Sequence, residues 1–142
     1  MPTAVKTVLA LDVGDKRIGV AAANTIARLA NPLTTLARSE TVLDELVQLV
    51  EAQTAAALVV GLPRGLGGQS TAQSQATKAF VKTLEARLGV PIYLQDEAVT
   101  SHQAEAELKA RGKTYAKGDI DALAATYILE DWLKQHPEVI DV

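Results

Sequence analysis

Three carboxylates that are far apart along the chain each lie where a predicted element begins or ends. Asp12 closes a run of aliphatic residues, Glu97 follows a second apolar run, and Asp121 lies in the first turn of a predicted helix. Gly14 allows the backbone to reverse after Asp12, so that a further apolar run at 18–23 can pair with the first. Each acid alone has an ordinary explanation, because Asp and Gly are common turn residues and the helix dipole favours an acid at a helix start. The chemistry therefore depends on whether the three acids meet.

Three carboxylates that converge without a cation repel one another, which raises the pKa of at least one of them. A divalent metal relieves this repulsion, and ligands that are all oxygen atoms suit Mg²⁺ or Mn²⁺. Two such ions about 3.5–4 Å apart stabilise the attacking and leaving oxygens in phosphodiester hydrolysis, so no nucleophilic side chain is needed. The sequence has no cysteine, and zinc would have only His102 and His136 as nitrogen ligands. An oxygen-bound Mg²⁺ or Mn²⁺ is therefore favoured over zinc.

Two further segments have compositions that suit contact with phosphate groups. The loop at 61–68 contains four glycines and Arg64, so its backbone amides can face an anion. It lacks the lysine and hydroxyl of a phosphate loop, and a flexible connector is an equal alternative. From Lys109 to Lys117 there are four cations, Lys113 among them, with one aromatic residue and no acid. A solvated surface loop is the alternative for this second segment.

Apolar alternation and short apolar runs predict five strands. They are 8–12, 18–23, 30–36, 57–61 and 92–95. Pro32 confines part of the third strand to a sheet edge, and the first three strands suggest an antiparallel meander. The last two runs are short and apolar, which favours buried strands of a parallel sheet.

Helical periodicity predicts helices between and after the later strands. One starts at Thr41 with Asp44 at the reciprocal capping position, and a second has a stripe of apolar residues at four-residue intervals from 72 to 88. A third is expected at 100–111, and the last begins near Asp119. The stripe expected to be buried in this last helix is Ile120, Leu123, Ala124, Tyr127, Ile128 and Trp132.

The expected fold is therefore α/β, with a mixed sheet of about five strands, three antiparallel and then parallel, and helices on both faces. Ligands of such sheets gather beyond the carboxyl ends of the parallel strands, where Asp12 and Glu97 lie. Alternation along a strand turns Asp96 and Glu97 to opposite sides, so only one of this pair is expected to be a ligand. The length of 142 residues predicts a single domain spanning 1–142.

The bulk composition predicts a cytoplasmic protein without membrane contact. No apolar run approaches the ~20 residues of a membrane span, and the N-terminus lacks a secretory pattern. The net charge of −3 argues against a protein that holds nucleic acid over its whole surface, although a local basic patch would suffice.

Four ordered motifs give the chain a resemblance to the YqgF group of Holliday junction resolvases and ribosomal RNA nucleases, within the ribonuclease H-like superfamily. The first motif is similar to the segment LDVGDKRIGVA at 11–21, and the second to VGLP at 60–63 followed by the glycines at 67–68. The third corresponds to DEAVTS at 96–101, and the fourth to IDALAA at 120–125. The likeness covers nearly the whole length of the chain.

The resemblance implies that Asp12, Glu97 and Asp121 are metal-binding catalytic acids. It also implies that three basic residues lie near the phosphodiester, namely Lys16, Arg17 and Arg64. Lys113 and Lys117, from the basic segment, are added here as candidate substrate contacts. Where the family usually has Arg after the Glu, this chain has Ala98, which removes a planar cation able to bind phosphate. Substrate preference and catalytic rate depend on what replaces that cation.

The leading hypothesis from the resemblance is a metal-dependent nuclease that matures the 5′ end of pre-16S ribosomal RNA. A Holliday junction resolvase is the alternative within the same class, and it would need a dimer to cut paired strands. A catalytically silent RNA-binding assembly factor is a further alternative, motivated by Ala98 and by the basic segment. A sugar-kinase-like enzyme also begins with Asp-x-Gly, but 142 residues cannot supply its two domains. The expected partner is nucleic acid, either precursor RNA or branched DNA, bound by a monomer or a homodimer.

Overall fold

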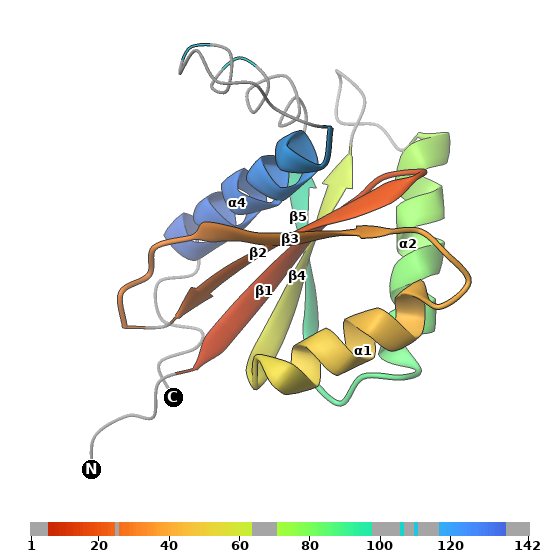
Figure 1. Ribbon diagram of the computed structural model, residues 1–142, viewed down its shortest axis with the longest axis horizontal. Helices are drawn as coiled ribbons and strands as arrows, with labels where there is room; N and C mark the ends of the chain where they lie inside the picture. The colour runs from red at the N-terminus through yellow and green to blue at the C-terminus, as the bar shows by residue number, and fades with distance from the viewer. Residues whose placement is uncertain are drawn as a thin grey trace.

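The apolar runs of the sequence form one mixed sheet in the order β3-β2-β1-β4-β5 (Figure 1). The computed structural model describes residues 6–24, 26–63, 71–97, 106, 110 and 117–135. The strands are β1 (Thr7–Val13), β2 (Arg17–Asn24), β3 (Asn31–Ala37), β4 (Ala55–Pro63) and β5 (Ile92–Glu97). The helices are α1 (Val42–Ala52), α2 (Ala72–Glu85) and α4 (Lys117–Gln135). None of the helices in this described part is both long and apolar enough to cross a membrane.

The pairing of the strands confirms the predicted fold class. β1 and β2 pair antiparallel, as do β2 and β3, and β4 lies parallel to both β1 and β5. Pro32 lies on β3, which is an edge strand as expected, because an edge tolerates a residue without a backbone N–H. The expectation that 92–95 forms a buried strand was wrong. β5 is the other edge of the sheet, and Leu94 is 44% exposed.

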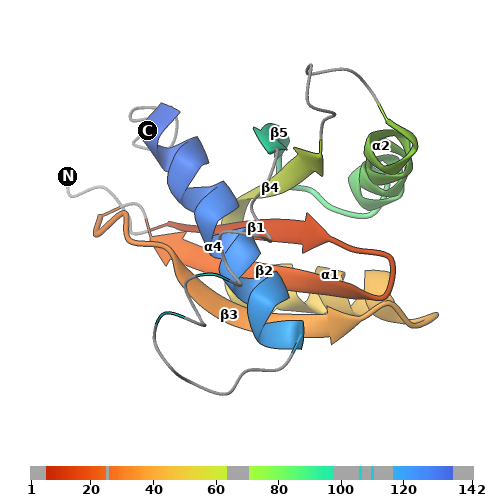
Figure 2. The same ribbon diagram turned by 90° about the horizontal axis from the view of Figure 1, so that it is seen from above.

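Helices cover both faces of the sheet, with α4 on one face and α1 and α2 on the other (Figure 2). The alternation along β1 separates the two cores, since Leu9 and Leu11 belong to the core under α1 and α2, whereas Val8 and Ala10 belong to the core under α4. The layers therefore follow from the two-residue period of a strand.

Small side chains, among them Ala10, Ala21 and Ala57, make up much of the sheet face under α4, and this lets the helix lie very close to the sheet. A Cβ atom on Gly19 would lie 2.0 Å from the carbonyl oxygen of Asp121, and one on Gly61 would lie 2.4 Å from Cδ1 of Ile128. Neither position has room for a side chain, so two glycines on β2 and β4 set the distance between helix and sheet. At its far end, α4 is bonded to the β2–β3 connection by Arg28, whose guanidinium donates to the carbonyl oxygen of Leu133 at 2.9 Å.

The helix starts differ from the sequence expectation at one place. Thr41 is the N-cap of α1, but its side chain makes no capping hydrogen bond, and Asp44 forms an ion pair with Arg87 instead. The predicted Thr41–Asp44 capping pair was therefore wrong. The backbone of Thr41 (φ −100°, ψ 7°) is not extended, its N–H donates to Oγ of Ser39, and its hydroxyl is hydrogen-bonded to the same oxygen. A capping box is present at the start of α2, where Thr71 and Ser74 each accept from the other's backbone N–H.

The expected stripes of α2 and α4 were right in part. On α2, Phe80 and Leu84 are buried as predicted, but the first half buries Ser74 and Thr77 instead of alanines. On α4, Ala124, Ile128 and Trp132 are buried as predicted, but Ile120, Leu123 and Tyr127 are only partly buried. The buried face includes Ala125, Leu129 and Leu133 in their place. The helix expected at 100–111 lies outside the described residues, apart from 106 and 110.

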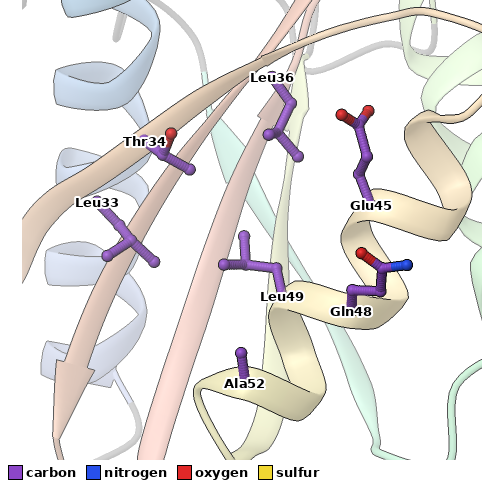
Figure 3. Close-up of a pocket in the computed structure, with 7 residues that line it drawn as sticks. All are labelled: Leu33, Thr34, Leu36, Glu45, Gln48, Leu49 and Ala52. Carbon is purple, nitrogen blue, oxygen red and sulfur yellow. The ribbon is translucent and has the colours of Figure 1, made fainter.

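A groove of about 430 Å³ separates β3 from α1 on the other side of the sheet (Figure 3). Leu33, Leu36 and Leu49 give it apolar walls, and Glu45 and Gln48 line its α1 side. The groove is formed because β3 is an edge strand, so α1 covers only part of its surface.

Gly19→Ala is expected to lower the free energy of unfolding by roughly 2–3 kcal/mol, because the new methyl group overlaps backbone atoms of α4 that cannot move without displacing the helix. The matched control is Gly89→Ala, whose Cβ would meet nothing within 4 Å and which should change stability by less than about 0.5 kcal/mol. Urea denaturation of both variants measures the difference. Equal midpoints for the two variants would contradict the assignment of Gly19 as the close contact.

Candidate active site

Asp12 lies near the carboxyl end of β1, directly opposite Gly19 of β2. It has the same strand parity as Val8 and Ala10, so it belongs to the face that α4 covers. The side chain is partly buried. Burial raises the pKa of Asp12 from 3.8 to about 6, and the negative charge of Asp121 adds to the increase. The protein therefore holds this carboxyl group in surroundings that disfavour its ionised form.

Asp121 reaches the same place from α4. The helix begins at Lys117, so Asp121 lies one turn further inside than the first-turn position that the sequence suggested. The helix dipole acts mainly on the first turn and no longer gives a sufficient reason for an acid here. The reason for its position is the contact of its own carbonyl group with Gly19, which fixes the backbone of Asp121 over β2. Two of the three predicted acids are thus brought together on one face of the sheet.

Arg17, the first residue of β2, forms an ion pair with Asp121. Its Nε donates a hydrogen bond to Oδ2 of Asp121 at 2.7 Å, and the two side chains are 35% and 19% exposed. The sequence motif placed Arg17 near a phosphodiester and did not indicate this pair. Strand parity could have indicated the pair, because Arg17 shares the parity of Gly19 and Ala21 and therefore lies on the face that α4 covers.

Glu97 is the last residue of β5 and pairs with Pro63 at the end of β4. On β5, Tyr93 packs against the core under α4 and contacts the ring of Trp132 at 5.2 Å between centroids. Glu97 has the same parity as Tyr93, whereas Asp96 has the parity of Ile92, which packs against the opposite core. The backbone therefore assigns Glu97, and not Asp96, to the face that carries Asp12. The side chain of Glu97 lies outside the described part of the structure.

Of the remaining predicted residues, one lies on the surface and the others lie wholly or partly outside the described residues. Lys16 is exposed in the turn between β1 and β2. Lys117 is the first residue of α4, with its side chain outside the description. Arg64, Lys113 and Ala98 lie outside the described residues altogether. Of the candidate phosphate contacts, the structure therefore places Arg17 against Asp121 and Lys16 in the exposed turn that follows Asp12, and it does not describe the side chains of the others.

The turn that carries Lys16 is held by a residue that the sequence did not single out. The guanidinium of Arg38 donates to the carbonyl oxygen of Gly14 at 3.1 Å, and the Arg38 backbone N–H donates to that of Lys16 at 2.9 Å. The same guanidinium lies 4.9 Å from the ring centroid of Phe80 on α2. Gly14, expected from the sequence to let the backbone reverse, has no room for a side chain, since a Cβ there would lie 2.8 Å from the carbonyl oxygen of Arg17. Its small size therefore serves the turn first.

The donor set fits a hard divalent cation as far as it is described. Asp12 and Asp121 supply carboxylate oxygens, which Mg²⁺ and Mn²⁺ prefer. The pKa of Asp12 is raised mainly by burial and further by the charge of Asp121, and a cation bound beside both carboxylates would favour their ionised forms. Among the described side chains, no three His, Cys, Asp or Glu residues come close enough to form a complete metal site. Completion of the site would need an acid such as Glu97.

A family match and relatives in sequence indicate one family. Residues 6–135 match the family RuvX, which is described as Holliday junction resolvase. A protein of Gloeothece citriformis, named "Putative pre-16S rRNA nuclease", is 40% identical over 131 residues, covering 89% of this chain and 87% of the relative. A protein of Pseudomonas savastanoi with the same name is 35% identical over 144 residues, covering 98% and 99%.

The fold is similar to that of structurally known resolvases at low sequence identity. Thermus thermophilus RuvC, solved in complex with a Holliday junction substrate, has a TM-score of 0.55 at 16% identity and covers 91% of this chain and 95% of its own. The fowlpox virus Holliday junction resolvase has a TM-score of 0.53 at 12% identity, with coverage of 91% and 98%. This likeness concerns the fold alone. The match over residues 6–135 and the relatives that are 35–40% identical show that the chain, which has a ribonuclease H fold, belongs to the RuvX family of nucleases.

Proposed function

We propose that this protein is a metal-dependent nuclease of one domain that hydrolyses phosphodiester bonds in the precursor of 16S ribosomal RNA in the cytoplasm. The observation that supports it most is the convergence of Asp12 and Asp121, from a central strand and a distant helix, on one face of the sheet. The names of the relatives that align along nearly their whole length point to the same substrate.

Asp12, Asp121 and Glu97 are the proposed ligands of Mg²⁺ or Mn²⁺. When bound, such a cation supplies an activated water and stabilises charge on the phosphate oxygens. The chain's own residues fix where this occurs. Asp12 comes from the central strand β1, which pairs with β2 at Asp12 itself and with β4 as far as the preceding residue, Leu11. Asp121 is restrained by its contact with Gly19, so both acids are supported by rigid elements.

Basic residues around the acids are the proposed contacts of the RNA backbone. Lys16 is exposed on the turn next to Asp12. Arg38 holds this turn by a backbone hydrogen bond to Lys16, and its guanidinium packs on the ring of Phe80. We extend the proposed contact surface to Arg64, Lys113 and Lys117 on sequence grounds. Since these residues hold phosphates and not bases, they would give affinity that depends strongly on salt and little on sequence.

Cleavage of four-way DNA junctions is the second candidate, because the matched family is described as Holliday junction resolvase. Symmetric cutting of two strands needs two active sites related by a two-fold axis, and therefore a homodimer. A comparison of a pre-16S RNA transcript, an unstructured RNA and a four-way DNA junction as substrates, with the protein's mass in solution, separates the two functions.

Asp12→Asn should reduce Mn²⁺-dependent cleavage of a pre-16S transcript by at least about 100-fold, because it removes a charged oxygen ligand from the centre of the site. Asp15→Asn is the matched control, since Asp15 is exposed in the adjacent turn and its loss should leave the rate within about two-fold of the unmodified protein. Gel analysis of end-labelled RNA gives both rates. Equal cleavage by the Asp12→Asn variant and the unmodified protein would refute the proposed mechanism.

Asp12→Asn should also make the metal-free protein more stable at high pH. A carboxyl with a folded-state pKa near 6 and an unfolded pKa of 3.8 binds its proton more tightly in the folded state. Its ionisation therefore costs roughly 3 kcal/mol of folding free energy at pH 8, and this cost fades as the pH falls through 6 towards 4. Urea denaturation in EDTA should give the variant a higher free energy of unfolding than the unmodified protein at pH 8, and nearly the same value at pH 4. A constant difference across this range would contradict the pKa of Asp12.

A further inference from the structure

The contact between Arg17 and Asp121 uses one atom from each group. Nε of Arg17 bonds Oδ2 of Asp121 at 2.7 Å, and this is the single hydrogen bond found between the two side chains. A guanidinium has five N–H donors and a carboxylate has two oxygens, so this contact leaves Oδ1 and the donors on both Nη atoms for other partners. The arrangement differs from a bidentate pair, which would occupy both carboxylate oxygens.

Both ends of this contact are anchored to the backbone of the sheet. Arg17 opens β2 and pairs with Ala37 of β3. The backbone of Asp121 lies against Gly19, two residues further along the same strand and on the same face. The direction of the Asp121 carboxylate is therefore determined by two points on β2, the close contact at Gly19 and the hydrogen bond from Arg17.

We propose that Arg17 is a positioning residue for Asp121, which holds Oδ2 so that Oδ1 is presented to the divalent cation beside Asp12. This inference rests on the proposed function and assigns Arg17 a role besides that of a phosphate contact. Hydrogen-bonded partners of metal-binding carboxylates fix ligand orientation, and their loss costs about 10- to 100-fold in metal affinity. The 35% exposed side chain of Arg17 leaves its Nη donors within reach of solvent and substrate.

Charge and orientation predict opposite results when Arg17 is neutralised. A positive charge next to the site repels a metal ion, so charge alone predicts tighter metal binding in Arg17→Gln. Loss of orientation predicts weaker binding. The sign of the change in metal affinity therefore distinguishes the two effects, and no measurement of activity is needed.

The test is isothermal calorimetry of Mn²⁺ binding to the full-length protein without substrate. Arg17→Gln should weaken binding by about 10-fold or more. The matched control is Lys16→Gln, which removes the same charge from the exposed neighbouring residue and should leave affinity unchanged or slightly increased. Arg17→Lys keeps the charge but places the donor one bond further out than Nε. Its Mn²⁺ affinity should therefore fall by an intermediate factor of about three.

Each outcome decides between the inference and the proposed function. Unchanged or tighter Mn²⁺ binding by Arg17→Gln would overturn the positioning role while leaving the metal-dependent nuclease intact. If Arg17→Gln does not fold, Arg17→Lys decides the question, and an affinity equal to that of the unmodified protein would overturn the inference. Absence of Mn²⁺ binding by the unmodified protein, or full binding by Asp121→Asn, would refute the proposed metal site and the inference with it.

Discussion

The close approach of α4 to the sheet is the constraint on which the rest of the structure depends. The helix lies across a face of small side chains, and at Gly19 and Gly61 even a methyl group would overlap helix atoms. This distance is what allows an acid on the last helix to lie beside an acid on the first strand. Asp121 belongs to the site because its backbone lies against β2, and Arg17 can reach it because the same strand carries both contacts.

The site that results is electrostatically unfavourable in the metal-free protein. Burial and the charge of Asp121 together raise the pKa of Asp12, so the fold works against the ionised form that a metal ligand needs. Arg17 supplies one positive charge and is itself partly exposed, so it offsets this only in part. The stability for this arrangement comes from elsewhere, above all from the two apolar cores on either side of the sheet. Such a local cost in stability is expected at ligand-binding sites, because groups placed to contact a ligand interact unfavourably with one another when the ligand is absent.

The strands could be predicted from the sequence, but the contacts between the elements could not. All five strands could be predicted because strand periodicity depends on neighbouring residues, and Pro32 correctly marked an edge. The capping pair of Thr41 and Asp44 was wrong because Thr41 bonds Ser39 instead, while Asp44 pairs with Arg87, more than 40 residues away. The exposed position of β5 was also missed, since strand order is a property of the whole sheet and a short apolar run occurs at centres and edges alike.

The same distinction applies to the site. Asp12 and Asp121 could be named from motifs, but their shared face required the register of β1 on β2 and the closeness of α4. The ion pair of Arg17 was not predictable from the motif, which contains Lys16 and Arg17 side by side without indicating that one faces solvent and the other an acid. The start of the strand separates these two neighbours, because Lys16 lies exposed in the turn, whereas Arg17 is the first residue of β2 and shares the parity of Gly19 on the face that α4 covers. Two adjacent cations of one motif thus lie in different surroundings. Arg17, at the first position of β2, is the one whose side chain can orient Asp121 on α4.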